Sequence, residues 1–215
     1  MTSPLDLAAQ RREYSAQGLR EADVSLDPII QLQRWLDESV TAGVTDATAM
    51  CLTTVSTAGA PSSRVVLLKK LDEHGLVFFT RTSSQKAQEI LGNPQVSLLF
   101  HWRELNRQVR ISGRATPTSA EENWEYFRTR PRNSRLAARV ASHRTTVADR
   151  HTLEELFAAE DHAHPGDEIP IPDDWGGYLV RPSEFEFWQG RESRLHDRLL
   201  YTPAESGWLI RRLAP

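Results

Sequence analysis

Three strand-like runs joined by short turns restrict the fold of this 215-residue chain more than any other feature. The runs cover residues 49–55, 63–69 and 76–80, and turns at 57–61 and 72–75 separate them. Turns of this length cannot contain the crossover helix that a parallel pair of strands requires. We therefore predict an antiparallel meander rather than alternating βαβ units, in a mainly β fold of the α+β class.

Helical and further strand signals surround these runs. Apolar residues recur at helical spacing after Asp27 and Pro28, and a capping residue with early acids opens a helix at 117–122. The predicted helices are 5–19, one from Pro28, one from Ser83 or Ser84, one that opens within 117–122, and one at about 149–161. Further strands are predicted at 96–102, 107–113, 175–180, 184–187, 199–201 and from Trp208 onward.

Composition narrows the class of protein. A net charge of -3 and a pI near 6.2 argue against nucleic acid as a partner. The single cysteine, Cys51, excludes an intramolecular disulfide, and His162 and His164 lack a third ligand at useful spacing, so no metal site is predicted. No apolar window reaches membrane-spanning length, and residues 1–6 lack the features of a signal peptide. We expect one cytoplasmic domain over residues 1–215 that does not bind a membrane.

Residues 184–198 have the pattern of one wall of a ligand site. Phe185 and Phe187 alternate with glutamates, and the chain then breaks at Gly190 into a run that includes Arg194 and His196. An aromatic ring can stack on a planar ligand, and guanidinium groups can bind its anionic groups in a bidentate manner. The alternative is a hairpin with a charged, solvated turn.

Cationic side chains also gather elsewhere. Lys86 falls in the first turn of a predicted helix, where it opposes the macrodipole unless an anion binds there; the alternative is an ordinary helix with an unfavourable charge. Residues 128–135 hold the densest basic patch of this acidic chain, which fits the phosphate of a small molecule. The polar segment 5–19 is either a solvated arm or a flap over an anion.

Taken in order, these motifs resemble the FMN-dependent pyridoxamine 5′-phosphate oxidase family over nearly the whole chain. The motifs are Arg11-Arg12-Glu13-Tyr14, Arg64-Val65-Val66-Leu67-Leu68-Lys69, Lys86, Arg107-Gln108-Val109, Tyr126-Phe127, Arg130-Pro131, Ser134, Trp175-Gly176-Gly177, Phe187-Trp188-Gln189-Gly190, Arg194-Leu195-His196-Asp197-Arg198 and Arg212-Leu213-Ala214-Pro215. Each motif alone is weak evidence, but their common order is specific.

The resemblance implies a split β-barrel, a Greek-key FMN-binding fold with peripheral helices, which forms a homodimer with FMN at the subunit interface. Residues 1–20 would be a mobile arm or flap. The implied FMN-binding residues are Arg64, Val65, Leu68, Lys69, Phe79, Thr80, Gln85, Lys86, Gln108, Arg144, Thr145, Trp188 and Arg198.

The resemblance also implies a reaction in vitamin B6 metabolism. Pyridoxamine or pyridoxine 5′-phosphate would react with O2 to give pyridoxal 5′-phosphate and H2O2, and the amine would release NH3. The implied catalytic residues are Arg194 and His196, and the substrate-binding residues are Arg11, Arg12, Glu13, Tyr14, Lys69, Tyr126, Arg130, Ser134, Arg194 and His196. Two alternatives are a related split-barrel flavin oxidase of phenazine-type biosynthesis and a non-catalytic module that binds flavin or pyridoxal phosphate.

Three positions depart from the family pattern. Gln85 stands where the family usually has arginine, Arg144 and Thr145 stand where it usually has glutamine and serine, and Phe79 stands where tyrosine is common. The first two departures suggest that a cation has moved from one side of the FMN phosphate to the other. On this hypothesis Arg144 replaces the charge that Gln85 lacks.

Overall fold

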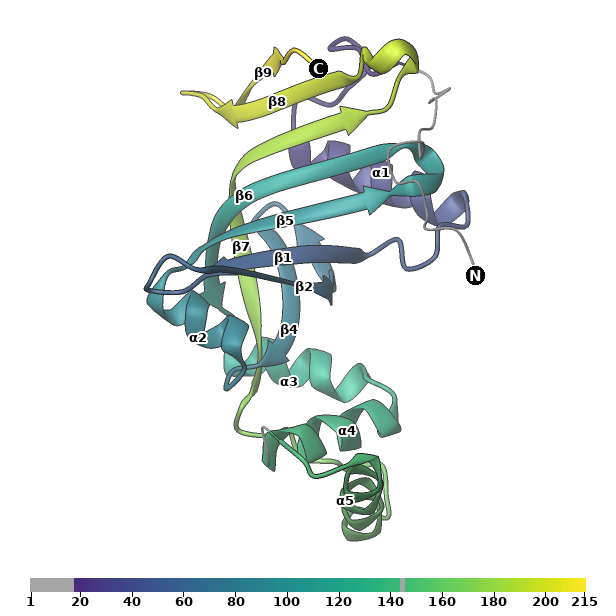
Figure 1. Ribbon diagram of the computed structural model, residues 1–215, viewed down its shortest axis with the longest axis vertical. Coiled ribbons are helices and arrows are strands. Elements are labelled where there is room, and N and C mark those ends of the chain that lie inside the picture. Colours follow the sequence, from purple (N-terminus) through teal and green to yellow (C-terminus); the bar gives the residue numbers. More distant parts are fainter. Residues whose placement is uncertain (1–17, 144–145) are drawn as a thin grey trace, which may run out of the picture. The chain divides into compact units, whose positions relative to one another are not determined.

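The computed structural model describes residues 18–143 and 146–215. Most of the predicted helix at 5–19 therefore lies outside the described residues. The helices are α1 (Pro28–Thr41), α2 (Gln85–Gly92), α3 (Ala120–Thr129), α4 (Arg132–His143) and α5 (Arg150–Ala163) (Figure 1). The strands are β1 (Ala49–Val55), β2 (Pro61–Leu67), β3 (Lys70–Asp72), β4 (Gly75–Arg81), β5 (Gln95–Trp102), β6 (Arg107–Pro117), β7 (Trp175–Gln189), β8 (Asp197–Pro203) and β9 (Trp208–Arg212). None of the described helices is long and apolar enough to cross a membrane.

The strands form a mainly antiparallel sheet whose order corrects the predicted meander. In the described residues the order is β2-β1-β5-β6-β7-β4-β3, with β8 pairing to β7 and β9. β1 and β2 are neighbours, as predicted; β4 pairs on one side with β3, across the predicted turn at 72–75, and on the other side with β7 instead of β2. Short turns could not indicate this second partner, because β7 comes about a hundred residues later in the chain. The mainly β, α+β class is confirmed.

The described residues fall into two compact units. Unit 1 contains α1 and the strand pair β8–β9, and unit 2 contains helices α2 to α5. Four strands, β1, β5, β6 and β7, contribute residues to both units. β7 pairs with β4 through residues 175–180 and with β8 through residues 185–189, so one continuous strand supplies a partner within each unit.

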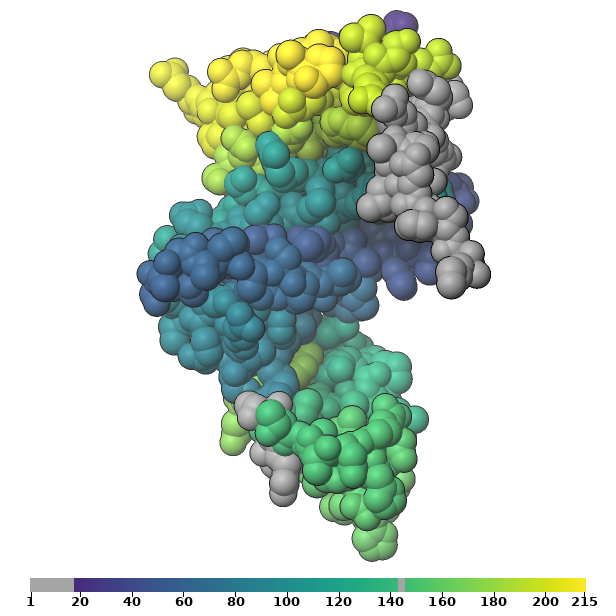
Figure 2. All heavy atoms as spheres, viewed as in Figure 1, coloured from purple at the N-terminus to yellow at the C-terminus, as the bar shows by residue number. Residues whose placement is uncertain are grey.

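In unit 1, helix α1 covers an aromatic core. The Asp27 side chain accepts a hydrogen bond from the Ile29 backbone N–H at 2.8 Å, which caps the helix start predicted at Pro28. Trp35 then packs edge-on against Phe187, with ring centroids 5.2 Å apart, and against Trp102 at 6.3 Å. Figure 2 shows the C-terminal strands, in yellow, at the surface of this unit.

In unit 2, α3 begins with a capping box between Ser119 and Glu122, as the early acids predicted. The sequence patterns did not predict helix α4, because its arginines indicated only a basic patch. Two arginines of α4, which lie two turns apart, pair with acids of α5: Arg132 with Asp161, and Arg139 with Glu160 at 2.7 Å. Because so many residues of this segment are charged, the helical spacing of its apolar residues was not recognised in the sequence.

Gly177 provides a test of how closely β4 and β7 approach. It pairs with Phe79, and a Cβ at position 177 would lie 2.7 Å from the Phe79 ring. We expect Gly177→Ala to push that ring aside and to lower the free energy of unfolding by about 1–3 kcal/mol. Chemical denaturation measures this change. Gly166→Ala is the control because a Cβ there meets nothing within 4 Å, and equal stability of the two variants would contradict the prediction.

Candidate functional site

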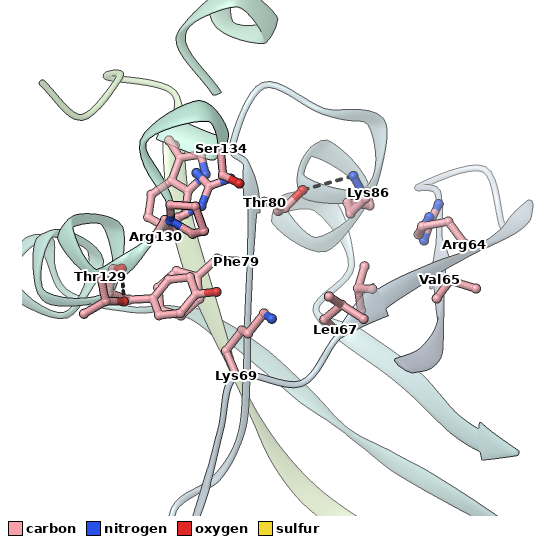
Figure 3. Close-up of a pocket in the computed structure, with 14 residues that line it drawn as sticks. Arg64, Val65, Leu67, Lys69, Phe79, Thr80, Lys86, Thr129, Arg130 and Ser134 are labelled. Carbon is pink, nitrogen blue, oxygen red and sulfur yellow. Dashed lines mark hydrogen bonds between the residues drawn. The ribbon is translucent and has the colours of Figure 1, made fainter. Parts of the chain in front are cut away.

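Unit 2 contains a cavity of about 610 Å³ that is bordered by cations at two places (Figure 3). Its walls come from β2, β4, α2, α3, the start of α4 and the first residue of β7. The lining residues are Arg64, Val65, Val66, Leu67, Lys69, Phe79, Thr80, Lys86, Tyr126, Thr129, Arg130, Pro131, Ser134 and Trp175.

The first cationic group surrounds Lys86 at the start of α2. Its Nζ donates hydrogen bonds to Thr80 Oγ1 at 3.0 Å and to Ser84 Oγ at 3.2 Å. Burial lowers the pKa of Lys86, and the nearby charges of Arg64 and Arg81 lower it further. Three cations close enough to repel one another, beside a helix N-terminus, form a site that an anion would stabilise.

Arg64 on β2 is held by a polar cluster next to this group. Its Nη1 donates to Leu52 O at 3.2 Å and to Thr54 Oγ1 at 2.6 Å, while its Nη2 donates to Ser62 Oγ at 2.5 Å. The same Nη2 lies 3.5 Å from a carboxylate oxygen of the buried Glu89 on α2. Arg64 is therefore fixed in place by its own unit before any ligand binds.

The second cationic group surrounds Arg130, at the C-terminal end of α3. Its guanidinium carbon lies 5.1 Å from the Trp175 ring centroid and 5.6 Å from that of Phe127. Burial lowers its pKa, and its Nη1 is buried without a hydrogen-bond partner in the described residues. An unpaired buried donor of this kind is costly, so its position on the cavity wall indicates a missing acceptor. Ser134 and Lys69 line the same cavity.

Stacked aromatic rings form part of the wall beside Arg130. The ring centroids of Phe79 and Tyr126 are 4.2 Å apart with an angle of 14° between their planes, and those of Phe79 and Trp175 are 5.2 Å apart at 6°. Together these rings form an apolar part of the wall. The cavity thus combines two cationic groups with an aromatic wall, which fits aromatic ligands that carry phosphate groups.

Unit 1 holds five further predicted site residues, on β6, β7, β8 and the loop that joins β7 to β8. Trp188 lies 4.8 Å from His196 between ring centroids, and the Arg191 backbone N–H donates to His196 Nδ1 at 3.0 Å. In a neutral imidazole the proton therefore lies on Nε2. Arg194 has φ of 60°, in the left-handed region that non-glycine residues rarely adopt.

Two hydrogen bonds within unit 1 hold the Arg198 side chain in place. Its Nε donates to Glu186 at 2.7 Å and its Nη1 donates to the Ala214 carbonyl at 2.8 Å. Glu186 is buried and also pairs with Arg110 at 2.5 Å. The hydrogen bond to Glu186 raises the pKa of Arg198, which stays charged. Gln108 is half-buried on β6 of the same unit.

The predicted residues therefore divide into three sets. The cavity of unit 2 brings together Arg64, Val65, Lys69, Phe79, Thr80, Lys86, Tyr126, Arg130 and Ser134. Leu68 is buried and Gln85 is exposed, and neither lines the cavity; Gln108, Trp188, Arg194, His196 and Arg198 belong to unit 1. Arg11, Arg12, Glu13, Tyr14, Arg144 and Thr145 lie outside the described residues.

Sequence reasoning did not assign five of the lining residues to the site, namely Val66, Leu67, Thr129, Pro131 and Trp175, and it also missed Glu89, which lies next to Arg64. Trp175 belongs to a predicted motif but was not assigned to the site, and Glu89 was not assigned to any motif. The signal for Glu89 is its position four residues after Gln85, on the same face of α2: Gln85 Nε2 donates to Glu89 at 2.8 Å. The sequence does not reveal that this carboxylate is buried.

Comparisons with known proteins identify the family. Residues 36–160 match the family model described as pyridoxamine 5′-phosphate oxidase, and residues 175–215 match the pyridoxine 5′-phosphate oxidase C-terminal dimerisation region. Pyridoxine/pyridoxamine 5′-phosphate oxidases of Shewanella amazonensis and of a Nocardioides species are 46% and 49% identical to this chain, over 98% of it and 99% of each relative.

Solved structures share the fold. PhzG from Burkholderia lata, in complex with tetrahydrophenazine-1-carboxylic acid, matches with a TM-score of 0.87 and 30% identity, over 94% of this chain and 100% of that one. A pyridoxamine 5′-phosphate oxidase-related, FMN-binding protein from Nostoc punctiforme matches with a TM-score of 0.66 at 19% identity, over 87% and 96% of the two chains, which shows the fold alone.

Fold and family models together define a split-barrel flavoprotein oxidoreductase whose cofactor is FMN. The chain belongs to the pyridoxine/pyridoxamine 5′-phosphate oxidase family of vitamin B6 metabolism. Its match to the dimerisation region supports a homodimer.

Single variants test the exchange of cations between positions 85 and 144. We expect Arg64→Ala to weaken FMN binding roughly 10- to 100-fold, because it removes charge-assisted hydrogen bonds. If Arg144 replaces the missing charge at Gln85, Arg144→Gln also weakens binding, and flavin fluorescence titration measures both effects. Arg114→Gln, on an exposed part of β6, is the control. Unchanged FMN affinity in Arg144→Gln, with a sharp loss in Arg64→Ala, would contradict the exchange.

Proposed function

We propose that this chain is an FMN-dependent oxidase that converts pyridoxamine or pyridoxine 5′-phosphate, with O2, to pyridoxal 5′-phosphate and H2O2. The amine substrate also releases NH3. The observation that carries this proposal is the buried, unpaired Nη1 of Arg130 on the wall of a cavity that has a second cationic group at Lys86. A flavin phosphate and a substrate phosphate need two separate binding places, and the cavity provides two.

The cofactor phosphate binds beside the N-terminus of α2. Arg64 and Lys86 contact it, with Thr80 holding the Lys86 ammonium in place. Val65, Lys69 and Phe79 line the same cavity and are assigned to the cofactor as well, as are Leu68 and Gln85, which lie outside the cavity lining. Bound FMN supplies the two-electron redox chemistry, and the chain supplies binding, orientation and charge.

The substrate phosphate binds at Arg130, together with Lys69, Tyr126 and Ser134. The Arg130 guanidinium is already fixed against two aromatic rings, so little side-chain entropy is lost when a phosphate accepts its unpaired hydrogen bond. The parallel rings of Phe79, Tyr126 and Trp175 form an apolar wall near this position, which excludes water from the charged contacts.

Arg194 and His196 orient the reacting end of the substrate, while Gln108, Trp188 and Arg198 contact the flavin. His196 donates from Nε2, since the Arg191 backbone N–H holds Nδ1 as an acceptor. Arg194 clamps the substrate ring rather than stabilising C4′, where loss of a hydride equivalent builds positive charge. Four of these five residues lie within the matched dimerisation region, 175–215, which supports FMN at the subunit interface.

A phenazine-type oxidase is the second candidate, and its support is the match to PhzG. Tetrahydrophenazine-1-carboxylic acid, with which that protein forms its complex, carries a carboxylate and no phosphate. The second cationic group, with Lys69, Arg130 and Ser134 on one cavity wall, favours a phosphorylated substrate here.

Turnover of purified protein with FMN tests the function directly. We expect H2O2 formation and O2 consumption with pyridoxine 5′-phosphate and pyridoxamine 5′-phosphate, and much less with unphosphorylated pyridoxine. The visible spectrum reports bound flavin in the same sample. Oxidation of a reduced phenazine carboxylic acid without turnover of either vitamer would favour the second candidate, and flavin binding without any turnover would favour a non-catalytic module.

Arg130 determines affinity for the phosphorylated substrate. We expect Arg130→Gln to raise the KM for pyridoxine 5′-phosphate by about tenfold or more, because a hydrogen bond to a charged group contributes about 1.5–3 kcal/mol. FMN affinity should stay unchanged. Arg128→Gln is the matched control, since Arg128 is exposed and pairs with Glu125 on the same helix. Equal KM values for the two variants would contradict this role of Arg130.

A further inference from the structure

Glu89 is a buried carboxylate next to the cations to which the FMN phosphate is assigned. It lies on α2, one turn after Gln85, and is 8% exposed. One of its oxygens, Oε2, accepts hydrogen bonds from the hydroxyl groups of Ser62, at 2.6 Å, and Thr54. The other, Oε1, accepts from the Gln85 amide at 2.8 Å. A negative charge in this position would repel a phosphate, so its presence needs a physical reason.

The hydrogen-bond pattern supplies that reason, because Glu89 and Arg64 share the same two hydroxyl groups. Thr54 and Ser62 each donate to the carboxylate and each accept from the guanidinium. Arg64 and Glu89 are therefore joined through two bridging hydroxyls and by their direct contact at 3.5 Å. Hydrogen bonds from Ser62, Thr54 and Gln85 lower the pKa of Glu89 to about 2, so the carboxylate is ionised throughout the physiological range.

We infer that Glu89 takes the place of the FMN phosphate as the counter-ion of Arg64 in the cofactor-free protein, and that it competes with that phosphate when FMN binds. This inference rests on the assignment of Arg64 to the cofactor phosphate in the proposed function. Glu89 is a positioning residue: it contacts Arg64, and no contact between it and FMN is required.

Two consequences follow from this arrangement. In the cofactor-free protein, Glu89 balances one of the three cations that otherwise repel one another around Lys86. In the FMN-bound protein, Glu89 repels the phosphate dianion across Arg64 and so weakens cofactor binding. The missing arginine at position 85 adds to this effect, since Gln85 donates a hydrogen bond to Glu89 without balancing its charge.

The comparison of FMN with riboflavin tests the inference, because the two ligands share a ring system and differ in the phosphate. Glu89→Gln keeps the side-chain volume and an acceptor oxygen but removes the charge. We expect it to lower the Kd for FMN roughly threefold to tenfold and to leave the Kd for riboflavin unchanged, as judged from the usual strength of one partly screened charge pair. Flavin fluorescence quenching in the full-length, cofactor-stripped protein measures both constants.

Glu205→Gln is the matched control. It removes the same charge from an exposed turn between β8 and β9 and should change neither constant. An FMN affinity of Glu89→Gln that equals or falls below that of the unaltered protein overturns the inference. If the variant folds only when FMN is present, the result supports the inference, because the phosphate then replaces the lost carboxylate; a variant that FMN does not restore overturns it.

The unaltered protein separates failure of this inference from failure of the proposed function. If the unaltered protein binds FMN and riboflavin equally well, Arg64 and Lys86 do not contact a cofactor phosphate, and both the cofactor part of the proposed function and the inference about Glu89 fall. If the unaltered protein prefers FMN and Glu89→Gln does not increase that preference, the inference about Glu89 alone is wrong.

Discussion

Repulsion among Arg64, Arg81 and Lys86 is the constraint on which the candidate site depends. Burial lowers the pKa of Lys86, and the nearby charges of Arg64 and Arg81 lower it further, so the folded unit keeps this cationic group at an energetic cost. Two carboxylates that do not line the cavity reduce this energetic cost. Glu89 pairs with Arg64. Asp174 accepts hydrogen bonds from Arg81 at 3.1 Å and from Ser83 at 2.5 Å. Lys86 instead donates to the uncharged hydroxyl groups of Thr80 and Ser84, so it is the cation best placed to meet a phosphate.

The backbone that positions these charges depends on β7. Its first part pairs with β4, which places Gly177 opposite Phe79 and so leaves room for the Phe79 ring, which lies nearly parallel to the rings of Tyr126 and Trp175. Its last part pairs with β8, which places Trp188 opposite Arg198. One strand thus organises the aromatic wall in unit 2 and the flavin-directed residues assigned in unit 1. A slip of one residue in either pairing would turn these side chains to the opposite face.

Local signals in the sequence were sufficient to predict most helices and strands, but not to predict which strands pair and which helices pack together. The cap at Asp27, the capping box at Ser119 and the start of α2 after Ser84 were all readable, because they depend on residues within one helical turn. The pairing of β4 with β7 was not readable, since a turn length constrains only the next strand. Helix α4 was missed for a different reason: its arginines find their partners on α5, which a pattern within one segment cannot show.

The sequence predicted the cationic residues of the candidate site but not the carboxylates that pair with them. A lysine at a helix N-terminus and an arginine-rich segment both signal an anion through like charges that lack local partners, and Lys86 and Arg130 do line the cavity. Glu89 gave no such signal, because a glutamate four residues after a glutamine is ordinary on a solvated helix. Its role arises from burial next to β1 and β2, where Thr54 and Ser62 donate to it and accept from Arg64. The arrangement joins the neighbouring strands β1 and β2 to a helix more than twenty residues further along the chain, so it belongs to the tertiary structure. A departure from a family pattern such as Gln85 is therefore best interpreted with the charges that the fold places next to it.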